Sequence, residues 1–427
     1  YKEDNMTETI WQSKNVKHYE SLQENISTDV LVIGGGICGM LTAYYLSKTF
    51  KVVLVEANKI ANSRTRKTTA VITALQDIYY KDIIKRMGKN SAKQYLEANL
   101  NAIEEYAKLS SFFDFDFERV NSYKYFKNQK KKLREEFSAI ESLGYSPKIE
   151  DDYAICFPNQ AQMNPLKLIL NLANYFTIYE NTKIIKLKNQ IAYTEMYHIN
   201  AKHIVVATGY PFLKLKGLYP LKLTQKKSYV AVVDDVKKER DFNAIGCEEG
   251  DLYFRTYENR LIIGGNDQKT GHTILGFKPL LHYIEQNYPN NPISYQWINQ
   301  DCISLDGLPY IGKYFKNQEV YVATGFNLWG MTGSMIAAQI LKDKINKERN
   351  PYESLFDPKR KCPMLPLAKN IATAIVNLLK PKKRCTHLGC SLYFNKEEGT
   401  YECPCHGSKY DINGKIIFNP ANQDKKI

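Results

Sequence analysis

Short hydrophobic runs alternate with helical patterns over the first part of the chain. Residues 30–33 and 52–55 are apolar and rich in β-branched side chains, and residues 40–47 between them are apolar with a helical period. This pattern predicts a strand, a helix and a second strand. Residues 203–209 and 320–325 repeat the strand pattern, and each run ends in Ala-Thr-Gly. The alternation favours an α/β fold.

Longer helices and further strands are expected between these runs. Apolar residues recur at every third or fourth position over residues 78–109, which predicts a helical region, and residues 112–117 alternate like a strand. Residues 212–317 are rich in strand patterns, including two strands joined by a hairpin turn at Glu258-Asn259. The fold class expected is therefore mixed, α/β with an α+β part.

The last quarter of the chain begins with a long helix, expected over Met331–Lys347. A Pro-rich linker over Pro351–Pro366 and a short amphipathic helix over Ala368–Leu379 follow. No stretch reaches the roughly 18 apolar residues of a membrane span, and residues 1–28 lack the apolar core of a secretory signal. We expect a cytoplasmic protein that is soluble or at most peripheral at the inner face of the membrane.

A glycine motif stands at the first strand–helix turn. Gly34, Gly36 and Gly39 match G-x-G-x-x-G, and Glu56 ends the second strand. The first glycine permits a tight turn, the second lets a pyrophosphate approach the backbone, and the third lets the helix pack on the strand. The helix N-terminus then offers N–H groups to the phosphates, and the acid takes a ribose hydroxyl. This context predicts a dinucleotide site, and the carboxylate argues against a 2′-phosphate.

The basic composition changes this picture little. The net charge of +14 comes from 59 Lys and Arg against 45 Asp and Glu. Clusters at Lys127–Arg134 and Lys380–Arg384 could attract an acidic partner. A solvated surface is the favoured interpretation, because no nucleic-acid motif is present and the aromatic residues are not interleaved with the basic runs. We expect no nucleic-acid partner.

Cysteine is distributed unevenly. Five of the nine cysteines are isolated and are expected to be reduced thiols: Cys38, Cys156, Cys247, Cys302 and Cys362. The other four, Cys385, Cys390, Cys403 and Cys405, lie within 21 residues and are accompanied by His387 and His406. Such a group is typical of a metal centre, and a Cys₂His₂ zinc site is the simplest alternative to an iron–sulfur cluster.

The glycine motif, the two Ala-Thr-Gly strands and the later segments DGLPYIG and VYVATGFNLWGMTG together resemble the D-amino-acid oxidase and glycine oxidase superfamily. The resemblance covers most of residues 26–347. It implies a two-domain fold with a discontinuous Rossmann-like domain and an antiparallel-sheet substrate domain. It also implies FAD, held at Gly34, Gly36, Gly39, Glu56, Gly209, Gly325, Gly330, Met331 and Thr332.

The chain departs from that family at the substrate site. Family glycine oxidases carry an Arg that binds the substrate carboxylate, whereas the matching place here reads Gln300-Asp301-Cys302. Arg255 is a candidate substrate contact, and a surface strand residue is the alternative. No His lies in residues 64–73, so we expect FAD to bind non-covalently.

The Cys/His group resembles the two loops of a Rieske [2Fe–2S] domain. The loops read Cys-Thr-His-Leu-Gly-Cys from Cys385 and Cys-Pro-Cys-His-Gly-Ser from Cys403. The resemblance implies one iron on Cys385 and Cys403, a second iron on His387 and His406, and a disulfide between Cys390 and Cys405. Ser408 and Tyr410 match hydroxyl donors to the cluster sulfurs, and Pro420-Ala421 matches a covering loop. A Rieske domain normally has several strands before its first loop, so either a stretch near residue 380 is omitted or those strands, and with them the cluster's stability, are lost.

The two resemblances divide the chain into four parts. The division expected is an FAD-binding domain of 26–76, 160–211 and 318–348, a substrate domain of 77–159 and 212–317, a linker and helix of 349–381, and a small all-β Rieske domain of 382–427.

An enzyme is the expected function: an FAD-dependent dehydrogenase that oxidises a small, amine-like substrate and passes electrons to its own Rieske centre. The external acceptor would be a protein or a quinone. A non-catalytic electron-transfer or redox-sensing protein and an amino-acid oxidase are alternatives. A Rieske oxygenase would need a mononuclear iron on two His and a carboxylate, and no such pair is evident among His18, His198, His203, His272 and His282.

Overall fold

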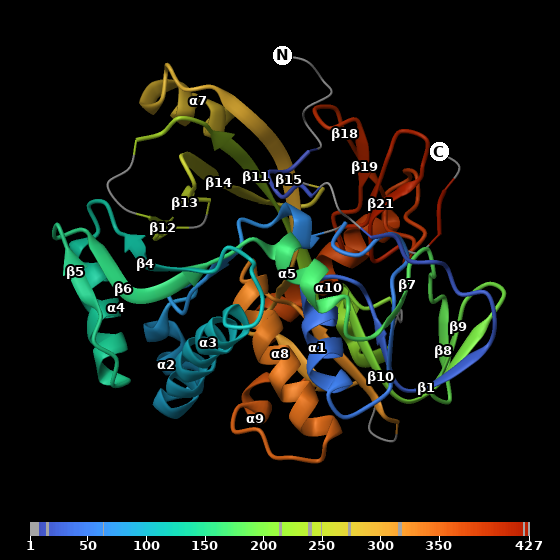
Figure 1. Ribbon diagram of the computed structural model, residues 1–427. Helices are drawn as coiled ribbons and strands as arrows, with labels where there is room; N and C mark the ends of the chain where they lie inside the picture. Colours follow the sequence, from blue (N-terminus) through green and yellow to red (C-terminus); the bar gives the residue numbers. More distant parts are fainter. Residues whose placement is uncertain are drawn as a thin grey trace.

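Three sheets organise the molecule (Figure 1). The computed structural model describes residues 8–13, 17–62, 64–212, 216–237, 241–248, 250–271, 275–314, 318–421 and 423–425. Within them, the first sheet has the order β16-β17-β10-β1-β2-β7, with β9 and β8 joined to β10. Its strands are β1 (Ile26–Ile33), β2 (Val52–Val55), β7 (Thr177–Tyr179), β8 (Lys186–Lys188), β9 (Ile191–Tyr193), β10 (His198–Gly209), β16 (Tyr310–Lys313) and β17 (Val320–Thr324).

The centre of the first sheet is parallel, as the alternating pattern predicts. Val30 of β1 pairs with Val52 of β2 on one side and with His203 of β10 on the other. The two Ala-Thr-Gly strands, β10 and β17, are parallel neighbours. The α/β fold class is confirmed, and every residue of β2 and most of β1 are buried because helices cover the sheet.

Helices α1 and α8 pack against each other and against strands of the first sheet, and α3 packs on α8 (Figure 1). All residues of α1 from Ile37 to Leu46 are buried, which explains its continuous apolar sequence. The helices are α1 (Ile37–Ser47), α2 (Tyr80–Met87), α3 (Lys89–Ser110), α4 (Lys130–Ser142), α5 (Pro165–Leu172), α6 (Tyr219–Lys222), α7 (Lys278–Asn287), α8 (Gly330–Ile345), α9 (Glu353–Phe356) and α10 (Met364–Leu379), with 3₁₀ turns η2 (Arg64–Lys67) and η3 (Lys216–Leu218).

The second sheet has nine strands in the described residues and is mainly antiparallel, with the order β15-β11-β14-β13-β12-β4-β6-β3 and β5 paired to β6. Only the β12–β4 contact is parallel there. The strands are β3 (Val71–Ile72), β4 (Glu118–Tyr125), β5 (Lys148–Glu150), β6 (Ala154–Gln162), β11 (Leu223–Val233), β12 (Phe242–Gly246), β13 (Tyr253–Tyr257), β14 (Arg260–Lys269) and β15 (Ile293–Ser304). The predicted hairpin at Glu258-Asn259 joins β13 to β14.

The expectation of a strand over residues 112–117 is wrong. This segment is a loop, and β4 begins only at Glu118. Asp116 has a φ of 52°, which interrupts an extended chain, and its carboxylate accepts a hydrogen bond from Tyr257 at 2.9 Å. The helical pattern of residues 78–109 is also divided, into α2 and α3, at Gly88 with φ 85°.

Two strands lie across the expected domain boundaries. β16, within 212–317, pairs with β17 and so belongs to the first sheet. β3, within 26–76, pairs with β6 of the second sheet. The chain therefore crosses between the two sheets at these points, which brings residues 64–77 between them.

A small third sheet lies at the C-terminus, beside β11 and β15 (Figure 1). Its strands are β18 (Tyr393–Asn395), β19 (Thr400–Glu402), β20 (Lys409–Tyr410) and β21 (Ile416–Phe418). A buried ion-pair group joins it to the second sheet. Lys227 Nζ, fully buried on β11, lies 2.6 Å from Glu398 Oε1 and 2.7 Å from Glu402 Oε1. Lys409 pairs with the other oxygen of Glu398.

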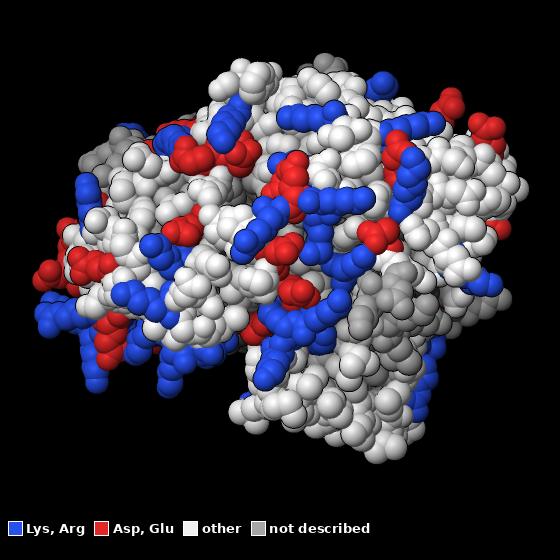
Figure 2. Space-filling view, turned by 90° about the horizontal axis from the view of Figure 1, so that it is seen from below, with Lys and Arg blue, Asp and Glu red and all other residues white. Residues whose placement is uncertain are grey.

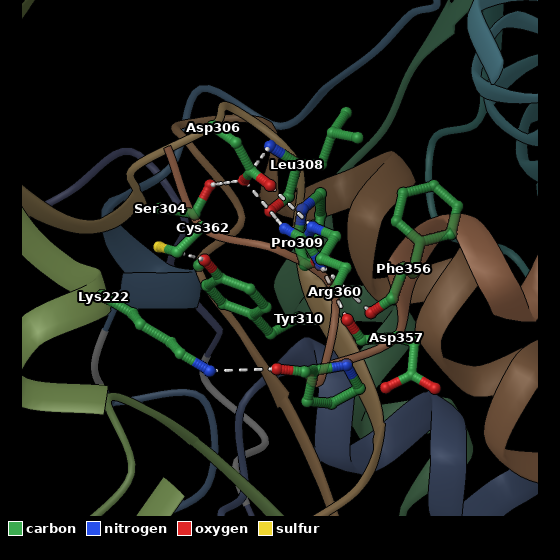
Figure 3. Close-up of polar contacts among 12 residues, drawn as sticks. Lys222, Ser304, Asp306, Leu308, Pro309, Tyr310, Phe356, Asp357, Arg360 and Cys362 are labelled. Atoms are coloured by element: carbon green, nitrogen blue, oxygen red, sulfur yellow. Dashed lines mark hydrogen bonds and ion pairs between the residues drawn. The ribbon is translucent and has the colours of Figure 1, made fainter. Parts of the chain in front are cut away.

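Arg360 anchors the segment between the first sheet and α10 (Figure 3). Its Nε and Nη2 donate to both oxygens of Asp306, at 2.6 and 2.8 Å, and Nη1 donates to Pro309 O at 2.8 Å. Lys222 Nζ donates to Pro358 O at 3.1 Å. The expected Pro-rich linker is thus fixed to the body of the protein.

Basic and acidic side chains are interspersed on one face of the molecule. On the face in Figure 2, Lys and Arg side chains are mixed with Asp and Glu and form no continuous basic band. Within the described residues, no helix combines the length and the hydropathy that crossing a membrane requires.

Candidate active site

A cavity of about 420 Å³ opens at the carboxyl ends of the parallel strands, and we call it the nucleotide cavity. Six of the nine residues expected to bind the dinucleotide line it: Gly34, Gly36, Glu56, Gly209, Gly330 and Met331. They come from the ends of β1, β2 and β10 and from the start of α8. An open parallel sheet binds ligands at this edge.

The glycines are placed as the motif predicts. A Cβ on Gly39 would lie 1.9 Å from Gly34 O, so only glycine lets α1 pack this close to β1. A Cβ on Gly34 would lie 2.6 Å from Ala207 O, and the residue has a φ of 115°. A Cβ on Gly36 would meet only Thr65 Oγ1, at 3.2 Å, so this glycine leaves its backbone open to the cavity.

Glu56 is held at the end of β2 by backbone donors. Its Oε2 accepts from Gly35 N at 2.7 Å and its Oε1 from Asn58 N at 2.9 Å. Burial raises the pKa of the Glu56 carboxyl, and these two hydrogen bonds oppose the rise. The carboxylate is therefore oriented along the cavity wall, where a ribose hydroxyl could reach it.

Three predicted cofactor residues do not line the nucleotide cavity among the described residues. Gly39 acts in helix packing. Gly325 faces Leu223 and Ser304. Thr332 is buried, and its hydroxyl accepts a hydrogen bond from Gln76 at 2.9 Å.

A second cavity, of about 570 Å³, is lined by strands of the second sheet and by residues of the 67–79 and 328–331 segments, and we call it the acidic cavity. Five residues line both cavities and make them continuous: Thr68, Asn299, Asp301, Leu328 and Met331. The acidic cavity carries five carboxylates, of Asp77, Glu248, Asp251, Asp267 and Asp301, against the three amines of Lys67, Lys132 and Lys226.

Two of these carboxylates have strongly perturbed pKa values. Burial, with the charges of Asp77 and Asp301, raises the pKa of Asp267 to about 7, although Lys226 opposes the rise. Burial raises the pKa of Asp301 to about 6 against the opposing charge of Arg64. Asp267 Oδ1 is buried without a hydrogen-bond partner in the described part of the chain. The cavity thus offers an unpaired acceptor to a ligand.

Arg255 does not line either cavity in the described residues, and it is not on the surface either. It is 1% exposed, and its guanidinium donates to Gln162 Oε1, Thr69 O and Met163 O. It also lies 5.0 Å from the centre of the Trp11 ring. All these partners come from distant segments, so the side chain supports the fold rather than binding substrate.

The six cysteines and histidines of the C-terminal loops converge in one buried cluster. All are at most 6% exposed: Cys385, His387, Cys390, Cys403, Cys405 and His406. The Sγ atoms of Cys390, Cys403 and Cys405 lie within 4.8 Å of one another, and no other group of three possible metal ligands is this close in the described residues. The rings of His387 and His406 are perpendicular, with centres 4.9 Å apart.

The surroundings of the cluster fit an iron–sulfur centre. His406 Nδ1 is buried and has no hydrogen-bond partner among the described residues, as expected of a metal ligand. Tyr410 OH lies 3.3 Å from Cys385 Sγ. All nine cysteines are free thiols here, so the Cys390–Cys405 disulfide stays a prediction.

The histidine side of the cluster faces the large sheets. The buried ring of Tyr210, after β10, meets the His387 ring edge-on with centres 6.1 Å apart. Gln225 Nε2 on β11 donates to His406 O, and Gln300 Nε2 on β15 donates to Gly407 O, both at 2.7 Å. Residues 415–421 of the same C-terminal part line the nucleotide cavity. Both predicted sites therefore share one wall.

Arg64 was missed by sequence reasoning, although it lies where these parts meet. Its guanidinium donates to Gln300 O at 2.6 Å, to Gln225 Oε1 at 2.8 Å and to Asn419 Oδ1 at 3.1 Å. The guanidinium also lies close to Gly209, because a Cβ added to that glycine would be only 2.3 Å from Arg64 Nη1. Its position in the polar turn after Glu56 gave no signal of these contacts.

Among the histidines considered for a mononuclear iron site, His272 lies outside the described residues.

Comparison with known proteins agrees with this arrangement. The fold and cavities define an FAD-type oxidoreductase that carries iron–sulfur loops. The family described as "FAD dependent oxidoreductase" matches residues 29–344, and the Rieske [2Fe-2S] domain matches residues 378–426. The chain belongs to the FAD-dependent oxidoreductase family and carries a C-terminal Rieske domain, so it is an enzyme that binds FAD and a [2Fe–2S] cluster.

One relative is similar over nearly its whole length. YhfW of Bacillus subtilis (strain 168), whose name describes it as a Rieske 2Fe-2S iron-sulfur protein, is 30% identical over 488 residues, covering 97% of this chain and 96% of that protein. The alignment is longer than the 427 residues of this chain, so the relative has segments that this chain lacks. The cytochrome b6-f complex iron-sulfur subunit 2 of Cyanophora paradoxa is 57% identical over 37 residues, which are 9% of this chain and 15% of that protein.

Solved structures show the same fold. Glycine oxidase from Geobacillus kaustophilus has a TM-score of 0.67 at 15% identity, covering 79% of this chain and 100% of that chain. L-proline dehydrogenase from P. horikoshii has a TM-score of 0.67 at 18% identity, covering 79% of this chain and 98% of that chain. At these identities the likeness concerns the fold alone, and it confirms the expected mixed fold class.

Proposed function

We propose that this enzyme oxidises a small cationic amine with FAD and delivers the electrons to its own Rieske centre. One observation supports the series arrangement most. Residues 415–421 of the Rieske part line the same cavity as the dinucleotide residues Gly34, Gly36 and Glu56. A cofactor in that cavity and a cluster on the loops that begin at Cys385 and Cys403 would be held by one continuous set of contacts.

The nucleotide cavity would hold FAD without a covalent bond. Gly36 leaves its backbone open to a pyrophosphate, and Glu56 would accept from a ribose hydroxyl. Gly209, Gly330 and Met331 would line the path toward the acidic cavity. When bound, FAD supplies two-electron oxidation of a C–N or C–H bond, and the protein supplies position and charge around it.

The acidic cavity would select the substrate. Asp301 lines both cavities, and Asp267 offers an unpaired buried oxygen in the acidic one. An ammonium group can donate to such oxygens, whereas a substrate carboxylate would be repelled by them. The place of the family's carboxylate-binding Arg is occupied by Gln300-Asp301-Cys302. These features favour an amine that lacks a carboxylate over an amino acid.

The cluster would be ligated as the Rieske resemblance implies. Cys385 and Cys403 would hold one iron, and His387 and His406 the other. Tyr410 OH, 3.3 Å from Cys385 Sγ, would donate to a sulfur and raise the potential. Ser408, whose Oγ accepts from Ala421 N at 3.0 Å, ties the covering segment to the second loop.

The substrate class is tested with anaerobic holoprotein and pairs of compounds that differ only by a carboxylate. The amine should bleach the flavin, and the matching amino acid should not. Asp267→Asn should raise the KM for the amine, while Asp251→Asn, whose carboxylate already pairs with Lys127 at 3.2 Å, is the control. Tight use of the amino acid, unchanged in Asp267→Asn, would instead favour an amino-acid oxidase.

The series arrangement is tested by removing the cluster. His387→Ala should keep its flavin and its bleaching by substrate, but should turn over slowly with one-electron acceptors. Flavin content and the unfolding temperature serve as controls for folding. Equal turnover with and without the cluster would show that the two cofactors do not act in series.

A further inference from the structure

Helix α10 (Met364–Leu379) is amphipathic, but its apolar side faces outward and its polar side faces the protein. Of the eighteen large apolar side chains exposed in the described residues, seven lie on this helix. They form what we call the α10 outer face: Met364, Leu365, Ile371, Ile375, Val376, Leu378 and Leu379, which are 38% to 78% exposed. A contiguous exposed apolar patch of this kind marks a site of interaction.

Polar residues hold the opposite side of α10 against the protein. Asn377 is the one buried residue of the helix, and its Oδ1 accepts from Tyr393 OH at 3.0 Å. Its backbone oxygen accepts from Ser391 N at 2.9 Å, and Asn370 Nδ2 donates to Leu221 O at 3.2 Å. The helix is therefore docked through its polar side, so the apolar residues point outward as a consequence of specific contacts.

The start of the helix is fixed as well. The Arg360–Asp306 ion pair and the Lys222–Pro358 hydrogen bond hold the segment that leads into α10 (Figure 3). The end is held by Arg384, whose Nη1 donates to Leu378 O at 2.6 Å. The α10 outer face is thus presented by a fixed element rather than by a free tether.

The charged residues within the segment that carries α10 are all of one sign. Between Pro358 and Cys385 the chain has eight basic residues and no Asp or Glu: Lys359, Arg360, Lys361, Lys369, Lys380, Lys382, Lys383 and Arg384. The side chain of Arg360 is only 9% exposed and pairs with Asp306, and Lys380 is half-buried. The other six basic side chains are exposed, on the helix or near its two ends. An apolar helix face with basic flanks is complementary to an anionic lipid surface, which offers phosphates above an apolar interior.

We infer that α10 docks this enzyme on anionic membranes, lying in the interface with its outer face among the acyl chains. Its 16 residues are too few to cross a bilayer, for which about 20 are needed. This inference does not depend on the substrate or on the order of electron transfer. It places the first cluster loop, which contacts Leu378 through Gly389 and Arg384, at the membrane side of the protein.

The test is sedimentation of the holoprotein with vesicles, with flavin colour as the measure of binding. Vesicles of phosphatidylcholine with phosphatidylglycerol should carry the protein down, and vesicles of phosphatidylcholine alone should carry little. Added salt should weaken the binding because the basic contribution is screened. The double variant Ile375→Glu, Leu379→Glu should reduce partition by about tenfold or more, since two apolar side chains no longer enter the interface.

A matched control is Met196→Glu, because Met196 is 81% exposed but lies on the β9–β10 connection. It should bind vesicles as the unaltered protein does. Lys382→Gln with Lys383→Gln should weaken binding and flatten its salt dependence. The inference is overturned if anionic vesicles do not bind the protein or if Met196→Glu matches the α10 variant. It is also overturned if gel filtration shows a dimer that the α10 variant dissociates, since a second copy then covers the face.

Discussion

Lys227 should carry much of the attachment between the Rieske domain and the flavin part. Its amine is 0% exposed and lies 2.6 and 2.7 Å from Glu398 and Glu402, which are themselves buried. Lys227→Met removes the cation and leaves Glu402 without its charge partner. Removing one member of a buried pair typically costs about 3–5 kcal/mol. Glu402 Oε2 still accepts from Gly271 N at 2.9 Å, so we expect the lower end, about 3 kcal/mol, or roughly a hundredfold in the docking equilibrium.

The chain offers a matched control across the same interface. Lys278 and Glu397 form an ion pair at 3.5 Å, but their side chains are 77% and 41% exposed. Solvent-exposed pairs contribute about 0–1 kcal/mol. Hydrogen exchange at the amides of β19 and β20 measures the opening free energy directly. Protection there should fall by about a hundredfold in Lys227→Met and by less than about fivefold in Lys278→Met.

Acid should weaken the same contact. Burial would raise the pKa of Glu398, but the charges of Lys409 and Lys227 outweigh it, and the pKa lies below its ordinary value. The stabilisation is therefore complete above the ordinary glutamate pKa and is lost as pH falls through the lowered one. Equal protection in Lys227→Met and Lys278→Met, at neutral and at acid pH, would refute the reasoning that this buried pair holds the domains together.

Three further predictions follow from the two cavities and the core. Gly36→Val should place a side chain against the pyrophosphate and yield protein without flavin; full flavin content in this variant would locate the site elsewhere. Arg255→Met should lower the free energy of unfolding by about 3 kcal/mol or more, because three acceptors lose a charged donor, and a change in KM alone would contradict this. Affinity for a cationic amine should fall as pH drops below about 7, since Asp267 becomes neutral there, and Asp267→Asn should remove this step and leave only the one near pH 6 that belongs to Asp301.

Local patterns predicted much of this protein. Gly34, Gly36, Gly39 and Glu56 lie within one strand–helix–strand unit, so their spacing alone determines their arrangement. The cluster residues were equally predictable, because Cys385 to Cys390 and Cys403 to Ser408 form two short loops with characteristic spacing. In both cases the residues that cooperate are close in sequence or form a complete motif.

The residues that join the parts could not be predicted in the same way. Lys227 and Glu398 are 171 positions apart, and Arg64 and Asn419 are 355 apart, so no local pattern connects them. Arg255 lies on the same face of a strand as Tyr253 and Tyr257, and this pattern is typical of a surface residue or of a pocket residue. It is buried because Thr69 and Met163, from other elements, supply its acceptors. The acidity of the second cavity likewise depends on Asp77, Asp267 and Asp301 meeting in space.

The central claim, that the flavin and the Rieske centre act in series within one chain, is tested most directly by the kinetics of cluster reduction. Anaerobic holoprotein would be photoreduced at the flavin and frozen at successive times, and the EPR signal of the reduced cluster would be recorded. The account predicts that the cluster signal grows as the flavin is reoxidised, at a rate that does not change with protein concentration. A rate proportional to protein concentration, or a cluster that stays oxidised beside reduced flavin, would contradict it.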